Sequence, residues 1–302
     1  MSDKQKIELI IIDLDGTLLN SDHELSERNK TVIKKAIASG IKVALATGKT
    51  RKSAENIIKE LGLNTPGVFV QGLMLYNADG TVKSQTKLDP KVARKVIQSA
   101  EQQGMDVVVY SGDRLLVKSN KPSVDKLAEF GEPMPQEKGQ LLNLVDTTII
   151  HKLMIIADNE RHLKKLQWQL NQQVGESVSF TTAAMLTSIE VLPKGGSKGN
   201  GVRALLRLLE VDAANVMAIG DANNDIEMLE LVGLGVAVGN ATAKVKEVAN
   251  QIVSSNDDDG VAEAIERFVL PEEKPEPEAT TETATEETKA EETTEASSEG
   301  ND

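Results

Sequence analysis

Short apolar strands alternate with amphipathic helices along most of this 302-residue chain. The first strand, "IELIIID" at 7–13, is apolar at nearly every position, which is typical of a strand covered by helices on both faces. A helix at 25–40 and a second strand at 41–47 follow it. This alternation predicts an α/β fold built on a doubly wound, Rossmann-like parallel sheet.

The same alternation returns in the last third of the chain. Further strands are expected at 67–72, 215–220, 235–239 and 251–254, and further helices at 51–62, 198–210, 224–232, 243–250 and 260–269. The early and late segments therefore contribute to one sheet, although about 100 residues of different character separate them.

The middle of the chain has the pattern of paired strands. Asp79-Gly80 stands between two extended segments, which is a hairpin signal. Expected helices lie at 90–104 and 160–173 and expected strands at 105–110, 114–119, 151–157, 177–182 and 188–193, with Trp168 expected in the local core. We therefore expect a catalytic core formed by 1–86 and 188–270, and an inserted α+β cap at 87–187.

The net charge of −13 is concentrated in the last residues. From 271 to 302 there are twelve acidic residues and two lysines, which leaves a charge of only −3 for the preceding 270 residues. Such a segment cannot bury enough apolar surface to offset its ordering entropy, so 271–302 is expected to be a disordered, solubilising tail. Neither part has the basic face of a nucleic-acid-binding protein.

Composition excludes several other classes. The chain contains no cysteine, so disulfides, thiolate metal sites and cysteine nucleophiles are excluded. It has no apolar run of the roughly 18 residues needed to span a bilayer, and its start lacks the apolar region of a secretory signal. We expect a cytoplasmic protein without membrane partners, a monomer or a small homo-oligomer, and do not exclude a mature organelle form.

Polar residues cluster where the predicted core strands end. These residues are Asp13 and Asp15 after the first strand, Thr47-Gly48-Lys49 after the second, Lys198 at the start of a late helix, and Asp221, Asn224 and Asp225 after a late strand. Ligands of doubly wound folds bind beyond the carboxyl ends of the strands, so these groups should meet at one edge. A cluster of carboxylates alone would repel itself, and Mg²⁺ together with substrate phosphate oxygens resolves that repulsion.

The segments "DLDGT", "ATGK", "GGSKG" and "GDANND" together resemble the four motifs of the haloacid dehalogenase superfamily. Their order, with an insert between the second and third, resembles the Cof-like sugar-phosphatase branch with its type IIB cap. The resemblance covers about 7–270. It implies a Mg²⁺-dependent phosphatase that hydrolyses small phosphate monoesters, such as sugar phosphates or similar phospho-metabolites, through an aspartyl-phosphate.

The resemblance also implies a role for each matching residue. Asp13 matches the nucleophile, and Asp15 matches the general acid that protonates the leaving oxygen and then activates water. Thr47 and Lys198 match phosphate binders assisted by the backbone of Leu14 and Gly48, and Asn224 matches a further phosphate contact. Asp221 matches a Mg²⁺ ligand beside the Asp13 carboxylate and the Asp15 carbonyl, and Asp225 matches a residue that supports the metal shell.

Two positions depart from the family pattern. Lys49 stands where arginine is usual, which keeps the charge but loses the planar fork of the guanidinium. Gln71-Gly72-Leu73 replaces an Asn-Gly-Ala type of segment that lies near the leaving group in the family. The substrate preference is therefore expected to differ from that of relatives.

Several alternatives stay open at this level. Lys194 could take the role of Lys198, and Asp221 or Asp225 could serve as a helix cap. A sugar phosphomutase of the same fold is an alternative function. A phosphorelay receiver is a weaker one, because its phospho-acceptor follows an interior strand and it has no insert of this length.

Overall fold

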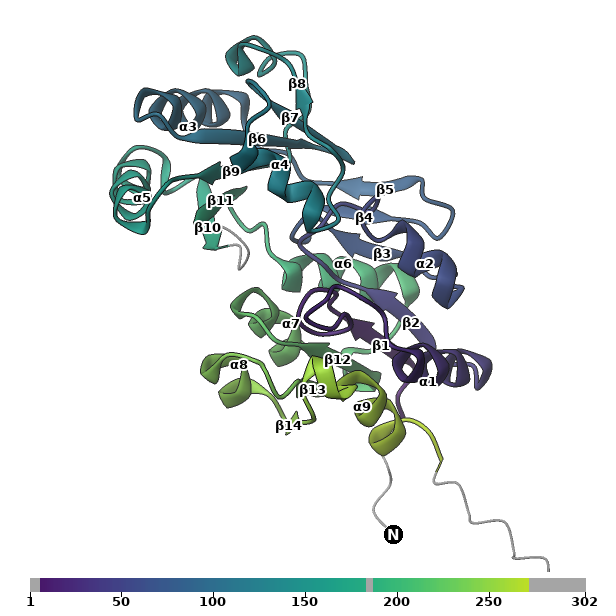
Figure 1. Ribbon diagram of the computed structural model, residues 1–302. Helices are drawn as coiled ribbons and strands as arrows, with labels where there is room; N and C mark the ends of the chain where they lie inside the picture. The colour runs from purple at the N-terminus through teal and green to yellow at the C-terminus, as the bar shows by residue number, and fades with distance from the viewer. Residues whose placement is uncertain (1–5, 183–186, 272–302) are drawn as a thin grey trace, which may run out of the picture. The chain divides into compact units, whose positions relative to one another are not determined.

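The computed structural model describes residues 6–182 and 187–271, and its architecture confirms the predicted α/β class (Figure 1). The predicted acidic tail lies outside the described residues, apart from Pro271. No helix in the described part of the chain is both long and apolar enough to cross a membrane.

The core sheet is fully parallel. Its strands lie in the order β14 (Gln251–Ile252), β13 (Leu234–Ala237), β12 (Val216–Gly220), β1 (Leu9–Ile12) and β2 (Lys42–Leu45). Leu9 in β1 pairs with Val216 on one side and with Lys42 on the other. In chain order, β2 is added on one side of β1, and the later strands β12, β13 and β14 are added on the other side. The strand order reverses between β1 and β12, and this is where doubly wound sheets bind ligands.

Helices flank this sheet, and their ends follow local sequence signals. They are α1 (Glu27–Ala38), α2 (Glu55–Leu61), α6 (Lys198–Leu209), α7 (Ile226–Leu231), α8 (Ala243–Val248) and α9 (Gly260–Phe268), with short 3₁₀ turns at Ala213–Asn215, Asn223–Asp225 and Asn256–Asp258. The hydroxyls of Ser26 and Ser197 accept backbone N–H bonds at the starts of α1 and α6. Helix α2 is shorter than expected, because residues 51–54 form turns before it.

A small antiparallel sheet continues the core beyond β2. It consists of β3 (Gly67–Phe69), β4 (Met74–Tyr76) and β5 (Val82–Gln85). The β4–β5 pairing confirms the hairpin predicted around Asp79-Gly80. Backbone N–H of Thr47 donates to the Val68 carbonyl at 3.0 Å, which joins the end of β2 to β3.

The inserted segment forms a six-stranded sheet of its own. The strand order is β10 (Val178–Thr182), β11 (Ser188–Pro193), β9 (Lys152–Ile156), β6 (Asp106–Ser111), β7 (Arg114–Val117) and β8 (Gln136–Glu137), antiparallel except at β7–β8. Its helices are α3 (Pro90–Gln102), α4 (Pro122–Glu129), α5 (Glu160–Val174) and a 3₁₀ turn at Leu141–Asn143. Helix α4 was not predicted; its eight residues begin at Pro122 and end two residues before Gly131.

The predicted division into a core and a cap stays a prediction. Strand β11, which the boundary at 188 assigns to the core, pairs with β9 and β10 of the six-stranded sheet. One expectation about the insert is wrong: Trp168 is 66% exposed, because α5 buries its Leu163, Leu166 and Leu170 side and turns the indole outward.

Candidate active site

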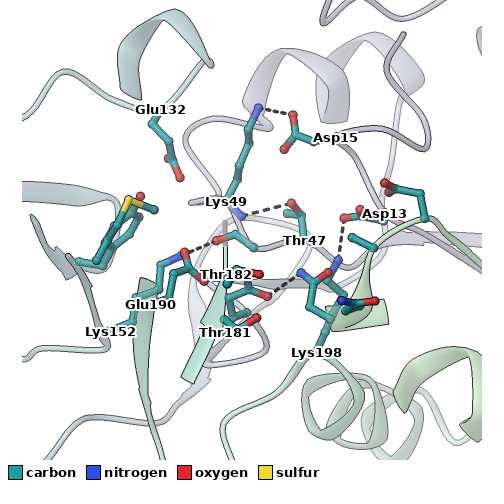
Figure 2. Close-up of a pocket in the computed structure, with 18 of the residues that line it drawn as sticks. Asp13, Asp15, Thr47, Lys49, Glu132, Lys152, Thr181, Thr182, Glu190 and Lys198 are labelled. Atoms are coloured by element: carbon teal, nitrogen blue, oxygen red, sulfur yellow. Dashed lines mark hydrogen bonds and ion pairs between the residues drawn. The ribbon is translucent and has the colours of Figure 1, made fainter. Parts of the chain in front are cut away.

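A cavity of about 230 Å³ opens at the reversal of the strand order and extends to the six-stranded sheet. Figure 2 shows its lining side chains. Of the predicted site residues, the cavity is lined by Asp13, Asp15, Thr47, Gly48, Lys198, Asp221 and Asn224. Leu14 and Asp225 are buried behind the cavity surface. The structure therefore brings the strand-end segments together as the topology requires.

Asp13 follows β1 directly and is buried beside Lys198. The Lys198 ammonium lies 2.8 Å from Asp13 Oδ1, and it is held at the first residue of α6. Burial raises the pKa of Asp13, while the Lys198 charge opposes that shift. For Lys198, burial works against the charged form, but the Asp13 and Asp225 carboxylates outweigh it and raise its pKa. Lys194 is exposed, so Lys198 is the lysine of this site.

Asp15 has a lysine of its own. The Lys49 ammonium lies 2.6 Å from Asp15 Oδ1, and His23 Nδ1 lies 3.7 Å from the same oxygen. Figure 2 shows Asp15 and Asp13 paired with two different lysines. The repulsion between these neighbouring carboxylates is thus reduced by separate ion pairs, and the lysine that departs from the family pattern makes one of them.

Asp221 and Asp225 complete the acidic cluster at the end of β12. The Thr17 hydroxyl donates to Asp221 Oδ1 at 2.8 Å. Burial, reinforced by the Asp225 carboxylate, raises the pKa of Asp221 to about 6. Gly16 has φ +75°, and a Cβ there would come within 2.7 Å of Asp221, so glycine permits this close approach of the β1 and β12 loops.

Asp225 is fully buried and already has donors on both oxygens. Lys198 donates to Oδ1 at 2.6 Å, while the backbone N–H groups of Asp221 and Ala222 donate to Oδ2 at 3.1 and 3.0 Å. These bonds fix the loop that carries Asp221. They make Asp225 a residue that positions the cluster.

The donor set of this cluster suits a hard divalent cation. One carboxylate oxygen from each of Asp13, Asp221 and Asp225 lies within 4.8 Å of the others. Oxygen donors of this kind are typical ligands of Mg²⁺. Burial raises the pKa values of Asp13 and Asp221, and the neighbouring carboxylates raise them further. The residues present therefore fit a Mg²⁺ ion.

The segment after β2 presents a hydroxyl and a fixed peptide to the cavity. Thr47 is buried, and its hydroxyl accepts the Lys49 N–H at 3.2 Å. The Gly48 carbonyl accepts a 3.0 Å bond from Lys152, which belongs to β9 of the other sheet. Both the carbonyl and the N–H of the Gly48–Lys49 peptide bond are thus hydrogen-bonded.

The loop that carries Gln71 has an unusual backbone. Val70, Gln71 and Gly72 all have positive φ angles, of 53°, 59° and 85°. A β-branched residue in this conformation is strained, and such strain persists only where the surroundings enforce it. A Cβ on Gly72 would lie 1.9 Å from the Ser197 carbonyl oxygen, so this loop packs directly on the start of α6.

Gln71 uses this backbone to connect the two sides of the cavity. Its Oε1 accepts a 2.9 Å bond from Asn224, and its Nε2 donates a 2.8 Å bond to Glu190 of β11. The sequence marked Gln71 as a departure from the family pattern. It gave no sign that this side chain would join Asn224 to the insert.

Lys152 and Glu190 are site residues that sequence reasoning missed. They form a buried ion pair between β9 and β11, and the Lys152 ammonium also lies 4.2 Å from the centroid of the Tyr110 ring. Both stand within strands of otherwise apolar pattern. The only available signal was a charged residue in a strand that reads as buried, which favours a paired or functional group.

Glu132 was missed as well. It follows α4, where Gly131 has φ 79°, and its carboxylate enters the cavity wall. Its Oε2 accepts bonds from the hydroxyls of Thr50 and Ser53, at 2.8 and 2.5 Å. Because this helix was not predicted, its end could not be assigned to the site.

Comparisons with known proteins agree with this geometry. The sequence profile of haloacid dehalogenase-like hydrolases matches residues 10–265. The chloroplastic endoribonuclease YBEY of Arabidopsis thaliana is 38% identical over 88% of this chain, and the chain spans 47% of that longer protein. An HMP-PP phosphatase of Yersinia enterocolitica is 27% identical over 86% of this chain and 95% of its own length. The crystal structure of a haloacid dehalogenase-like hydrolase from Bacteroides thetaiotaomicron has a TM-score of 0.80 and 29% identity, covering 87% of this chain and 99% of its own.

Proposed function

The chain belongs to the haloacid dehalogenase-like hydrolases, and we propose that it is a phosphatase that hydrolyses small phosphate monoesters through an aspartyl-phosphate on Asp13. The observation that carries the proposal is the position of Asp13 in the cavity, beside the Lys198 ammonium at 2.8 Å and within the carboxylate cluster. The phosphatase name of the Yersinia relative supports the same reaction class.

In the first step, an Asp13 carboxylate oxygen attacks phosphorus and the bond to the leaving oxygen breaks. Asp15 gives its proton to that leaving oxygen. Lys198, the Thr47 hydroxyl and Asn224 hold the phosphate oxygens, together with the backbone at Leu14 and Gly48. These groups all lie at or directly behind the cavity wall.

In the second step, water attacks the phosphorus of the aspartyl-phosphate. Asp15 accepts the proton of this water, and the bond between phosphorus and Asp13 breaks to release inorganic phosphate. Lys49, at 2.6 Å from Asp15, stabilises the carboxylate that exists between the two steps.

A Mg²⁺ ion held by Asp13 and Asp221, with the Asp15 carbonyl contributing and Asp225 in support, would neutralise charge on the transferred phosphoryl group. The positive charge of the ion would also favour the ionised form of Asp13 that nucleophilic attack requires, because burial and the Asp225 and Asp221 carboxylates raise the pKa of that carboxyl.

The partner is accordingly a small phosphorylated metabolite, and a Cof-like sugar-phosphate hydrolase is the form of this activity that we favour. A phosphomutase would return the phosphoryl group to a sugar instead of releasing it. The six-stranded insert and the family membership argue against a phosphorelay receiver. For location, we propose the cytoplasm or an organelle, as the chloroplastic relative has.

Asp15→Asn tests this mechanism. It removes the proton donor and keeps the backbone carbonyl, so hydrolysis of an alkyl phosphate should fall by about 10²- to 10⁴-fold. With an activated aryl phosphate, the first step should lose less than the second, and phosphoenzyme should accumulate on Asp13. Acid quench and peptide mapping by mass spectrometry would detect the adduct.

Three outcomes would contradict the proposal: parental rates in Asp15→Asn, an adduct on a peptide without Asp13, or a wild-type enzyme that isomerises a sugar phosphate without releasing phosphate.

A further inference from the structure

The wall of the cavity opposite Asp13 carries charges of both signs, but its cation is already paired with a carboxylate of the protein. Among the described residues, the cations that line the cavity are Lys49, Lys152 and Lys198. Lys198 pairs with Asp13 at 2.8 Å, and Lys49 pairs with Asp15 at 2.6 Å. Lys152, on the insert side, is buried against Glu190.

Lys152 is held so fully that it cannot serve as a counter-ion for a substrate. Besides its ion pair with Glu190, its ammonium donates to the Gly48 carbonyl and lies over the Tyr110 ring. Glu190 is equally committed, because one oxygen faces Lys152 and the other accepts the Gln71 amide. This pair therefore contributes no net charge to the cavity wall.

Glu132 has no such partner. Its hydrogen bonds come from neutral donors, the hydroxyls of Thr50 and Ser53 and the backbone N–H of Thr50, and no lysine or arginine of the described chain forms an ion pair with it. It is also only 6% exposed, so water screens its charge poorly. The insert side of the cavity is consequently negative by one charge.

Tyr110 and apolar side chains complete this wall. Burial raises the pKa of Tyr110 well above its ordinary value, and the Glu132 and Glu190 carboxylates add a smaller effect in the same direction. The Tyr110 hydroxyl therefore stays protonated. Leu127 and Met154 add apolar surface nearby. The wall thus offers a carboxylate acceptor and apolar contact to a leaving group.

On the basis of the proposed phosphatase function, we propose that Glu132 selects the substrate by charge: the enzyme takes monophosphates whose leaving group is uncharged and bears hydroxyls, and rejects those with a second anionic group. A hydroxyl of the leaving group can donate to the Glu132 carboxylate. A carboxylate or second phosphate would be placed beside Glu132, whose charge no cation of the insert side neutralises, and like charges at close range in a poorly solvated site repel strongly.

The test uses pairs of esters that differ in one group. Sorbitol 6-phosphate and gluconate 6-phosphate differ only at carbon 1, as hydroxymethyl or carboxylate. Glycerol 3-phosphate and glycerate 3-phosphate form a shorter pair of the same kind. Calorimetric Kd values measured on Asp13→Asn with Mg²⁺ present report binding without turnover. In at least one pair, the protein should bind the uncharged ester tenfold or more tightly than the charged one.

Glu132→Gln, made in the same background, should reduce that preference to threefold or less. Glu129→Gln removes an exposed carboxylate at the end of the same helix and should leave it unchanged. Melting curves of both variants check folding. Equal affinities for both members of both pairs would overturn the proposal, as would an unchanged preference in folded Glu132→Gln. The phosphatase function fails by a different result, namely no phosphate release from any ester by the wild-type chain.

Discussion

The two walls of the cavity place their charges by different means. On the core wall, Asp13 and Asp221 follow the ends of parallel strands, and their loops hold them where a phosphate and a cation can approach. On the opposite wall, Lys152 and Glu190 stand within antiparallel strands and neutralise each other. Under the proposed function, the first wall would carry the chemistry and the second would select and position what enters.

The sharpest way to test the role of the core wall is Asp13→Asn. The variant keeps the shape of the side chain but loses the nucleophile, and phosphate release should fall by about 10⁴-fold or more. Steady-state assays with an aryl phosphate would measure this. Asp22→Asn changes an exposed carboxylate of the following loop and should keep the parental rate. A comparable loss in both variants would contradict the assignment.

Metal removal tests the same wall through stability as well as rate. EDTA should abolish phosphate release, and Mg²⁺ should restore it. Burial and Asp225 raise the pKa of Asp221 from 3.8 to about 6, so the metal-free protein should lose stability as pH rises through 6. Mg²⁺ binds the ionised carboxylates, and it should therefore raise Tm more at pH 7.5 than at pH 5.

At 100 times its Kd, a ligand stabilises a fold by about 2.7 kcal/mol, which is within easy reach of a thermal melt. The rise in Tm on adding Mg²⁺ should be larger at pH 7.5 than at pH 5. A Mg²⁺-induced rise in Tm that is equal at both pH values, or activity undiminished in EDTA, would contradict the assignment of the metal site.

Lys152→Met tests the opposite wall. It leaves Glu190 buried without its cation and frees the Gly48 carbonyl, so the free energy of unfolding should fall by about 3 kcal/mol. The double variant Lys152→Met, Glu190→Gln removes both charges and should recover most of that loss. Urea titrations of the wild type, both single variants and the double variant would measure the coupling energy. Additive losses would show that the pair is not coupled.

The smallest expected effect concerns His151, next to β9. Its Nδ1 accepts the Gly112 N–H at 3.0 Å, and its Nε2 lies 2.9 Å from Gln85 Oε1, so the neutral ring fits this site. Burial lowers the pKa of His151 below 6.5. Its contribution to stability is therefore complete above pH 6.5 and lost as pH falls through the lowered value.

Urea titrations between pH 7 and pH 5 should show this loss as a fall in the free energy of unfolding. His151→Gln should flatten that part of the profile, whereas the exposed His162→Gln should follow the wild type. An unchanged slope in His151→Gln would show that another group titrates.

These contrasts explain which residues the sequence could reveal. Asp13 and Asp221 were predictable as cavity residues because motif and strand-end position agree, and Lys198 because its motif agrees with a helix start. Lys152 and Glu190 were not, since a charge within a strand has no fixed spacing to its partner across the sheet. Glu132 depended on the unpredicted helix α4. Trp168 was placed in the core on its apolar character alone, although the helical spacing of Leu163, Leu166 and Leu170 puts it on the other face of α5.

The backbone at 70–72 has a consequence for how this enzyme can diversify. Gly72 cannot accept any side chain without colliding with the Ser197 carbonyl, so the course of the loop is fixed. The backbone N–H of Gln71 donates to the Thr47 carbonyl, while its side chain bonds to Asn224 and Glu190. Substitutions at 71 therefore change the chemistry offered to the leaving group on an unchanged frame. A mutational library confined to positions 71 and 132 should alter substrate range with little loss of fold, whereas one at position 72 should yield almost no folded protein.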